Sequence, residues 1–276
     1  MVRAHDTELG RDIAIKELLS RSYASELRFF REALITARLE HPSIVPVHEA
    51  GRWADGTPFY AMKLVSGRSL KELIANATTS AKRDALLPHV MAVADALAYA
   101  HTRNTIHRDL KPANVIVGNF GETVVIDWGL AKVLGEDDDV TDTPYRTSER
   151  TELTVVGTVL GTPAYMAPEQ QRGEHVDQRV DVYAIGAMLW ELCIGGALAA
   201  VPIEERAVAL RRAKLDKDLA TIISKAIAQR PELRYRDASD LAADLRAYET
   251  GARIAARNYT LPAMLAHWTR RHRTVA

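Results

Sequence analysis

The chain has 276 residues, 47% of them hydrophobic and 26% charged, which is ordinary for a soluble globular protein long enough to bury a large core. Lys and Arg together number 36, as do Asp and Glu, so the net charge indicates neither nucleic-acid binding nor membrane association. A single cysteine, Cys193, excludes a disulfide framework and indicates a reducing compartment, the cytoplasm. Its apolar neighbours predict a buried, unreactive thiol inside a helix.

The first seventy residues predict a small β-rich region that contains one helix. Apolar residues recur at helical spacing between Ser25 and Leu39, and His41-Pro42 ends that pattern because the residue before a proline avoids the α region. Turn residues separate the β-type segments around this helix, and strands are expected over residues 2–4, 12–18, 44–50 and 59–64.

The rest of the chain reads as mostly helical. Helices are expected over residues 70–75, 84–102, 179–193, 203–213, 219–229 and 238–249. Between them a hairpin is expected, with strands over 115–117 and 123–126. Together the two regions predict an α+β architecture. The polar segment 135–161 has no clear period, and a loop of that length inside a compact domain indicates a functional switch.

Ionisable and amide side chains gather in the short stretch before and after the hairpin. Asp109, Lys111 and Asn114 follow one another closely, and Asp127 comes directly after the apolar run Val124-Val125-Ile126. A carboxylate beside cations stays ionised and can accept a hydroxyl proton. Carboxylate and amide oxygens are ligands for Mg²⁺. The set therefore predicts phosphoryl transfer.

The wording of these motifs resembles the protein kinase family. His107 to Asn114 reads H-R-D-L-K-P-x-N, the catalytic loop; Asp127-Trp128-Gly129 resembles D-F-G with Trp in place of Phe; and Ala167-Pro168-Glu169 resembles A-P-E. Lys111 and the segment before A-P-E are similar to eukaryotic-like bacterial Ser/Thr kinases. The resemblance implies a bilobal fold within a kinase domain of residues 1–249, with an N-lobe over 1–64, a hinge over 63–66 and a C-lobe over 67–249.

The resemblance also implies a role for each site residue. Asp109 is the expected base, Lys111 neutralises the γ-phosphate, and Asn114 and Asp127 hold Mg²⁺. Lys16 is expected to clamp the α- and β-phosphates of ATP and to pair with Glu32. The adenine site is expected to use the end of a strand and three apolar walls, namely Met62, Lys63, Val65, Val2, Ala14 and Ile116.

Further landmarks imply structural and regulatory roles. Glu169 is expected to pair with Arg234, and Asp181 to anchor the catalytic loop backbone. Trp128 is expected to fill volume left by Thr36. Arg108 before the base implies control by activation-loop phosphorylation, with Thr154 and Thr158 as candidate sites, Thr151 behind them, and Thr162 bonding near the base.

The front of the chain departs from the family pattern. Met1-Val2 corresponds to the end of the G-x-G-x-x-G-x-V motif, so the glycine-rich loop and first strand are missing. Two explanations stay open, a start codon placed too late or a truncated, weakly active or inactive relative. The alternative function is a non-catalytic kinase-fold scaffold that binds partners.

The end of the chain differs from its body in charge. No acidic residue follows Glu249, whereas five arginines do, and the 250–276 tail is expected to be either a solvated helix or a juxtamembrane segment of a longer, membrane-tethered parent chain. The expected partners are ATP, protein substrates and, for trans-autophosphorylation, a second copy, with no nucleic acid.

Overall fold

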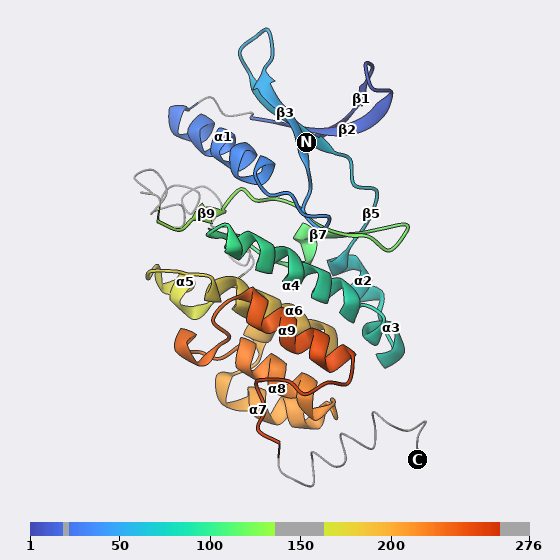
Figure 1. The fold of residues 1–276 in the computed structure, drawn as a ribbon, viewed down its shortest axis with the longest axis vertical. Helices are drawn as coiled ribbons and strands as arrows, with labels where there is room; N and C mark the ends of the chain where they lie inside the picture. Colours follow the sequence, from blue (N-terminus) through green and yellow to red (C-terminus); the bar gives the residue numbers. More distant parts are fainter. Residues whose placement is uncertain (19–21, 136–162, 260–276) are drawn as a thin grey trace, which may run out of the picture.

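The computed structural model describes residues 1–18, 22–135 and 163–259. Its N-terminal part is an antiparallel sheet in the order β1 (Val2–Asp6), β2 (Arg11–Glu17), β4 (Pro58–Lys63), β3 (Val47–Arg52). One helix, α1 (Tyr23–Ala37), packs against β3 and β4 (Figure 1). Apolar side chains from the sheet and the helix share a small core that includes Ala14, Phe29, Tyr60 and Met62.

Local signals explain where α1 and β3 begin. The Ser22 side chain accepts a hydrogen bond from the Ser25 backbone N–H at 3.1 Å, so this N-cap starts the helix earlier than the apolar pattern predicted. The predicted strand 44–50 was wrong at its start, because Ile44 and Val45 leave this sheet to meet Val125 of the hairpin. The Val45 N–H donates to the Val125 carbonyl at 3.1 Å, which joins the sheet region to the rest of the molecule.

The C-terminal part is a helical layer with its own, larger core. Contacts between α4 and α9 and between α6 and α8 hold it together, and Figure 1 shows these helices stacked below the sheet. Its longer helices are α4 (Leu87–Thr102), α6 (Arg179–Ile194), α7 (Ile203–Arg212), α8 (Lys217–Ala226) and α9 (Ala238–Glu249). Shorter ones are α2 (Leu70–Asn76), α3 (Ser80–Asp84), α5 (Pro168–Arg172), η1 (Pro112–Asn114), η2 (Leu198–Ala200) and η3 (Pro231–Leu233).

The predicted helix 84–102 is present as α4, which begins three residues later than predicted, and the short helix α3 before it was not predicted. α3 ends at Asp84, and α4 begins at Leu87 with Pro88 in its first turn. Proline suits that position, since the first N–H groups of a helix have no intrahelical partner.

Short strands lie between the two parts. The predicted hairpin is present as β7 (Val115–Gly118) and β8 (Thr123–Val125), and β5 (Gly67–Ser69) extends it to three strands. A second pair joins β6 (Thr105–Ile106) to β9 (Lys132–Val133). β5, β6 and β9 were not predicted, because two or three residues carry no periodic signal. The mixed α+β architecture itself is confirmed.

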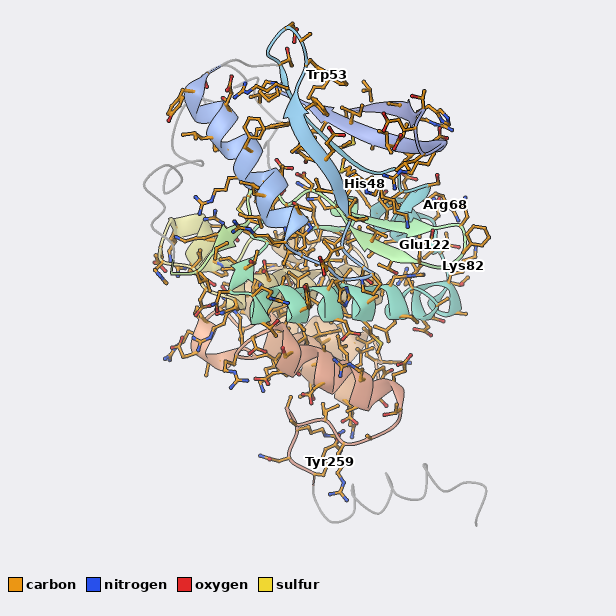
Figure 2. The ribbon with its side chains drawn as sticks, turned by 45° about the horizontal axis from the view of Figure 1, so that its top comes forward. His48, Trp53, Arg68, Lys82, Glu122 and Tyr259 are labelled. Atoms are coloured by element: carbon orange, nitrogen blue, oxygen red, sulfur yellow. The ribbon has the colours of Figure 1, made fainter. Side chains whose placement is uncertain are left out.

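Trp53 and Tyr259 lie at opposite ends of the described part of the molecule (Figure 2). Figure 2 shows Trp53 at the tip of the β3–β4 hairpin and Tyr259 at the opposite end of the molecule. Trp53 stacks on Phe59 at 4.2 Å and donates from its indole N–H to Glu17 at 2.8 Å. Within the three described ranges, no helix is both long and apolar enough to cross a membrane.

Cys193 lies in the last turn of α6 and is partly buried. Burial raises the pKa of its thiol to about 12, so the sulfur stays protonated and unreactive near neutral pH.

Candidate active site

A buried aspartate anchors the catalytic loop. Asp181, fully buried in the first turn of α6, accepts hydrogen bonds from the backbone N–H groups of His107 at 2.8 Å and Arg108 at 3.0 Å. His101 adds a third contact through Nε2 at 3.0 Å, and its Nδ1 accepts from the Ala238 N–H at 3.1 Å. Because Nδ1 is an acceptor, the proton is on Nε2, and this N–H donates a hydrogen bond to Asp181. The predicted anchoring role is confirmed.

These contacts decide the charge of Asp181. Burial alone would raise its pKa, but the His101 hydrogen bond, the nearby His107 and the backbone donor hold the pKa below its ordinary value. The loop is therefore tied to an ionised carboxylate in the core of the helical part.

Arg108 links the catalytic loop to two other segments. Its guanidinium Nε donates to the Leu130 carbonyl at 2.6 Å, beyond Asp127, and its own carbonyl accepts from Gln170 of α5 at 2.5 Å. Its φ of 66° lies in the left-handed region, which non-glycine residues rarely adopt. The loop backbone is thus fixed in a strained but well-supported conformation.

The predicted base and its neighbours lie together on this loop. Lys111 Nζ lies 2.6 Å from Asp109 Oδ2, and both side chains are about one-fifth exposed at 22% and 19%. The Asn114 amide nitrogen donates to the Asp109 carbonyl at 3.0 Å. That bond leaves the amide oxygen as the atom suited to a cation. The Ile126 N–H donates to the Asn114 carbonyl at 2.8 Å, which places Asn114 beside the segment between the end of β8 and Asp127.

The second cluster joins the sheet, α1 and Asp127. Lys16 Nζ lies 2.5 Å from Glu32 Oε1 and 3.7 Å from Asp127 Oδ1, so the predicted Lys16–Glu32 ion pair is confirmed. A Cβ on Gly129 would lie 3.1 Å from Glu32 Oε2 and 3.2 Å from Asp127 Oδ1. A larger residue here would therefore require the two carboxylates to shift by a few tenths of an ångström, and glycine leaves them room. Asp127 itself has a φ of 63°, which turns its carboxylate back toward Lys16.

The aromatic residue after Asp127 is a buried plug. Trp128 is 1% exposed, and its ring lies 4.7 Å from that of His107. Thr36 is also buried and donates from its hydroxyl to the Glu32 carbonyl at 2.8 Å. Whether Trp128 compensates for Thr36 stays a prediction.

The residues expected to line the adenine site lie on β1, β2, β4 and β7 and just after β4. Ala14 and Met62 are buried and directly opposed across β2 and β4. Lys63 ends β4, and Val65 packs partly buried beside the small core. Ile116 lies on β7, and Val2, 49% exposed, lies on the edge strand β1. Thr151, Thr154, Thr158 and Thr162 lie outside the described residues.

The described part of the site offers few side-chain donors to a metal ion. Among the described residues, no group of three or more His, Cys, Asp or Glu side chains could hold a metal alone. Asp127 and Asn114 offer one carboxylate and one amide oxygen, which fits an ion such as Mg²⁺ that takes its other ligands from phosphates and water.

A cavity of about 630 Å³ lies elsewhere, at the far end of the helical part. Residues of α3, α4, α8 and α9 and their flanking segments line it, including Asp84, Met91, Asp218 and Tyr248. None of the predicted site residues takes part, so this cavity is separate from the chemistry.

Sequence reasoning missed two residues, His101 beside Asp181 and Tyr60 beside Glu32. The Tyr60 hydroxyl donates to Glu32 Oε1 at 2.6 Å. Tyr60 stands two residues before Met62 on β4, so strand alternation places both on one face. That alternation was the available signal, but it does not specify a partner on α1.

Comparison with known proteins agrees with this geometry. A family model described as the protein kinase domain matches residues 1–262. The chain belongs to the protein kinase family. The crystal structure of the PknI kinase domain of Mycobacterium tuberculosis superposes with a TM-score of 0.63 at 27% identity, covering 88% of each chain.

Curated relatives are bacterial Ser/Thr kinases. A probable serine/threonine-protein kinase of Streptomyces coelicolor is 33% identical over 270 residues, covering 92% of this chain and 38% of the relative. PknB of M. tuberculosis, a serine/threonine-protein kinase, is 33% identical over 260 residues, covering 88% of this chain and 39% of the relative. The chain therefore spans about two-fifths of the length of these relatives.

Proposed function

We propose that this chain is the catalytic domain of a protein Ser/Thr kinase that transfers the γ-phosphate of ATP to hydroxyl groups of proteins. The observation that carries the proposal is the joint geometry of Lys16, Glu32 and Asp127 on one side and Asp109, Lys111 and Asn114 on the other. This set supplies a base, a phosphate clamp and metal ligands within one site.

Each residue has a defined task in the proposed reaction. Asp109 orients the substrate hydroxyl and accepts its proton. Lys111, whose Nζ lies 2.6 Å from Asp109 Oδ2, neutralises the transferring phosphate. Lys16 binds the α- and β-phosphates, and Glu32 orients Lys16. Mg²⁺, when bound by Asn114 and Asp127, would neutralise phosphate charge.

The proposed regulation uses Arg108. Arg108 contacts the carbonyl of Leu130, which precedes Thr154 and Thr158 in the chain. A phosphothreonine at either position would accept charge-assisted bonds from a guanidinium. Trans-autophosphorylation by a second copy, and a membrane tether in a longer parent chain, belong to the same proposal. So does the kinase domain over residues 1–249.

The test is transfer of radiolabelled phosphate from Mg²⁺-ATP to the chain itself and to casein. We expect labelling by the unmodified chain and a loss of at least about 100-fold in Asp109→Asn, because the general base is removed. Glu174→Gln, an exposed carboxylate paired with Arg172, is the matched control and keeps full activity. Nucleotide binding without labelling, in a folded chain, would contradict the kinase proposal and favour a non-catalytic scaffold.

A further inference from the structure

We propose that Tyr60 is a positioning residue for the Lys16–Glu32 pair. Its hydroxyl holds the Glu32 carboxylate, and with it α1, in place when Lys16 binds phosphate. The kinetic consequence rests on the proposed function, whereas the structural consequence can be measured without it.

Tyr60 and Lys16 share one acceptor atom. Glu32 Oε1 receives the Tyr60 hydroxyl at 2.6 Å and the Lys16 ammonium at 2.5 Å. Tyr60 is 4% exposed and Glu32 is 7% exposed, so water contributes little to solvating this carboxylate. A buried charge requires more than one hydrogen-bond donor to be stable. The Tyr60 hydroxyl therefore helps to stabilise the buried, charged carboxylate of Glu32.

Register and packing fix where the hydroxyl points. Tyr60 and Lys16 are directly opposed across β4 and β2, and Lys16 Nζ lies 5.8 Å from the Tyr60 ring centroid. On α1 the ring contacts Phe29 at 5.1 Å, three residues before Glu32. Residues three apart share a helix face. Tyr60 thus joins β4 to α1 twice, through its ring to Phe29 and through its hydroxyl to Glu32.

This arrangement matters because Lys16 has competing partners. Its Nζ also lies 3.7 Å from Asp127 Oδ1, and the proposed function adds nucleotide phosphates. Each partner draws the ammonium away from Glu32, and a buried carboxylate left without a donor is strongly destabilising. The Tyr60 hydroxyl remains a donor throughout, because burial and the neighbouring Glu32 raise the pKa of Tyr60. Glu32 can then hold α1 while Lys16 binds phosphate.

Tyr60→Phe tests the proposal, because it removes the hydroxyl and keeps the ring on Phe29. Tyr235→Phe is a matched control: Tyr235 is 2% exposed and donates to the buried Asp244 at 2.9 Å, within the helical part. Two quantities are measured in each variant, kcat/KM for ATP and amide hydrogen exchange of α1. We expect Tyr60→Phe to lower kcat/KM by about tenfold, and to speed exchange in α1, because a hydrogen bond to a charged group is lost. Tyr235→Phe changes neither quantity.

The same substitution in a Glu32→Gln background tests whether Tyr60 acts through Glu32. We expect a further loss below about twofold there, since the charged acceptor is already gone. A loss of thermal stability with unchanged kcat/KM and unchanged α1 exchange would overturn the proposal, as would equal Tyr60→Phe losses in both backgrounds. If the unmodified chain transfers no phosphate, the proposed function fails, and α1 exchange alone supports or overturns the role of Tyr60.

Discussion

Two site residues adopt a backbone conformation that most side chains resist. Arg108 and Asp127 have φ of 66° and 63°. Arg108 follows His107 and Asp127 precedes Trp128, and the rings of His107 and Trp128 are in contact. Such a conformation costs about 1–3 kcal/mol at each position and persists only where the surroundings enforce it. Here the Asp181 carboxylate holds one and the Lys16 ammonium faces the other. These contacts fix the backbone at two residues of the proposed site, and the proposed phosphoryl transfer would require such fixed positions.

The first prediction concerns Asp181 and pH. Its folded-state pKa lies below the ordinary value of 3.8, because the His101 and backbone hydrogen bonds outweigh burial. The carboxylate therefore stabilises the fold fully above that value, and the stabilisation is lost as pH falls through the lower folded pKa. We expect Asp181→Asn to lower the free energy of unfolding by about 3 kcal/mol at pH 7, because buried donors lose an ionised acceptor.

Urea unfolding from pH 7 to pH 3 measures the difference in free energy of unfolding between the unmodified chain and Asp181→Asn. It should stay constant down to about pH 5 and shrink below pH 4. Asp95→Asn, a partly exposed carboxylate paired with Arg246, should leave the pH profile as it is in the unmodified chain. A difference that grows as pH falls would contradict the assigned direction of the shift.

At the scale of elements, one arginine holds several segments together. Arg234 makes two bonds to Glu169 of α5, at 2.7 and 2.9 Å, which confirms the predicted pair. It also donates to carbonyls at Arg179, Ala228 and Gln229, so it joins α5 to α6 and to the end of α8. Both partners are buried. This pair therefore connects α5 to the helical core.

We therefore expect Arg234→Met to destabilise the fold strongly. Glu169 would remain buried without its partner, and we expect a loss of about 3–5 kcal/mol in the free energy of unfolding, measured with urea. Adding Glu169→Gln should recover part of that loss, because the unpaired charge is removed. Arg230→Ala, which breaks an exposed pair with Glu232, should leave the urea midpoint unchanged. An equal effect of the two arginine substitutions would contradict this account.

At the scale of the whole molecule, the proposed ATP site draws on separate parts of the chain. Lys16 comes from the sheet, and Asn114 and Asp127 come from the segments flanking the β7–β8 hairpin, so ATP would bridge the two parts. Anything that binds only the folded state stabilises it, by about 2.7 kcal/mol at 100 times its Kd. For a chain of this size we expect the thermal midpoint to rise by about 5–10 °C with saturating Mg²⁺-ATP.

Scanning calorimetry with and without Mg²⁺-ATP measures that rise. Lys16→Ala should abolish most of it, and Lys71→Ala, an exposed lysine on α2, should retain it. The absence of any rise in the unmodified chain would contradict nucleotide binding.

The partners of the motif residues were predictable because the sequence resembles the protein kinase family, whose motifs imply a partner for each of them. Lys16, Glu32, Glu169, Arg234 and Asp181 have the partners that the motifs indicated. His101 and Tyr60 could not be predicted, since their partners lie 80 and 28 residues away and neither belongs to a motif. The short helix α3 and the later start of α4 were missed for another reason. The five residues of α3 are too few for a periodic signal, and Ala85 and Leu86 continue the apolar pattern of α4 toward its N-terminus.

The backbone at Asp127 has a further consequence for how such a protein can change over generations. Gly and Asn are the other residues that accept a left-handed conformation readily, and each lies a single nucleotide substitution from the Asp codons. Either replacement would fit the turn after the strand while removing the carboxylate beside Lys16. A single nucleotide substitution at this position can therefore remove the proposed catalytic activity and keep the fold, which could then serve another function.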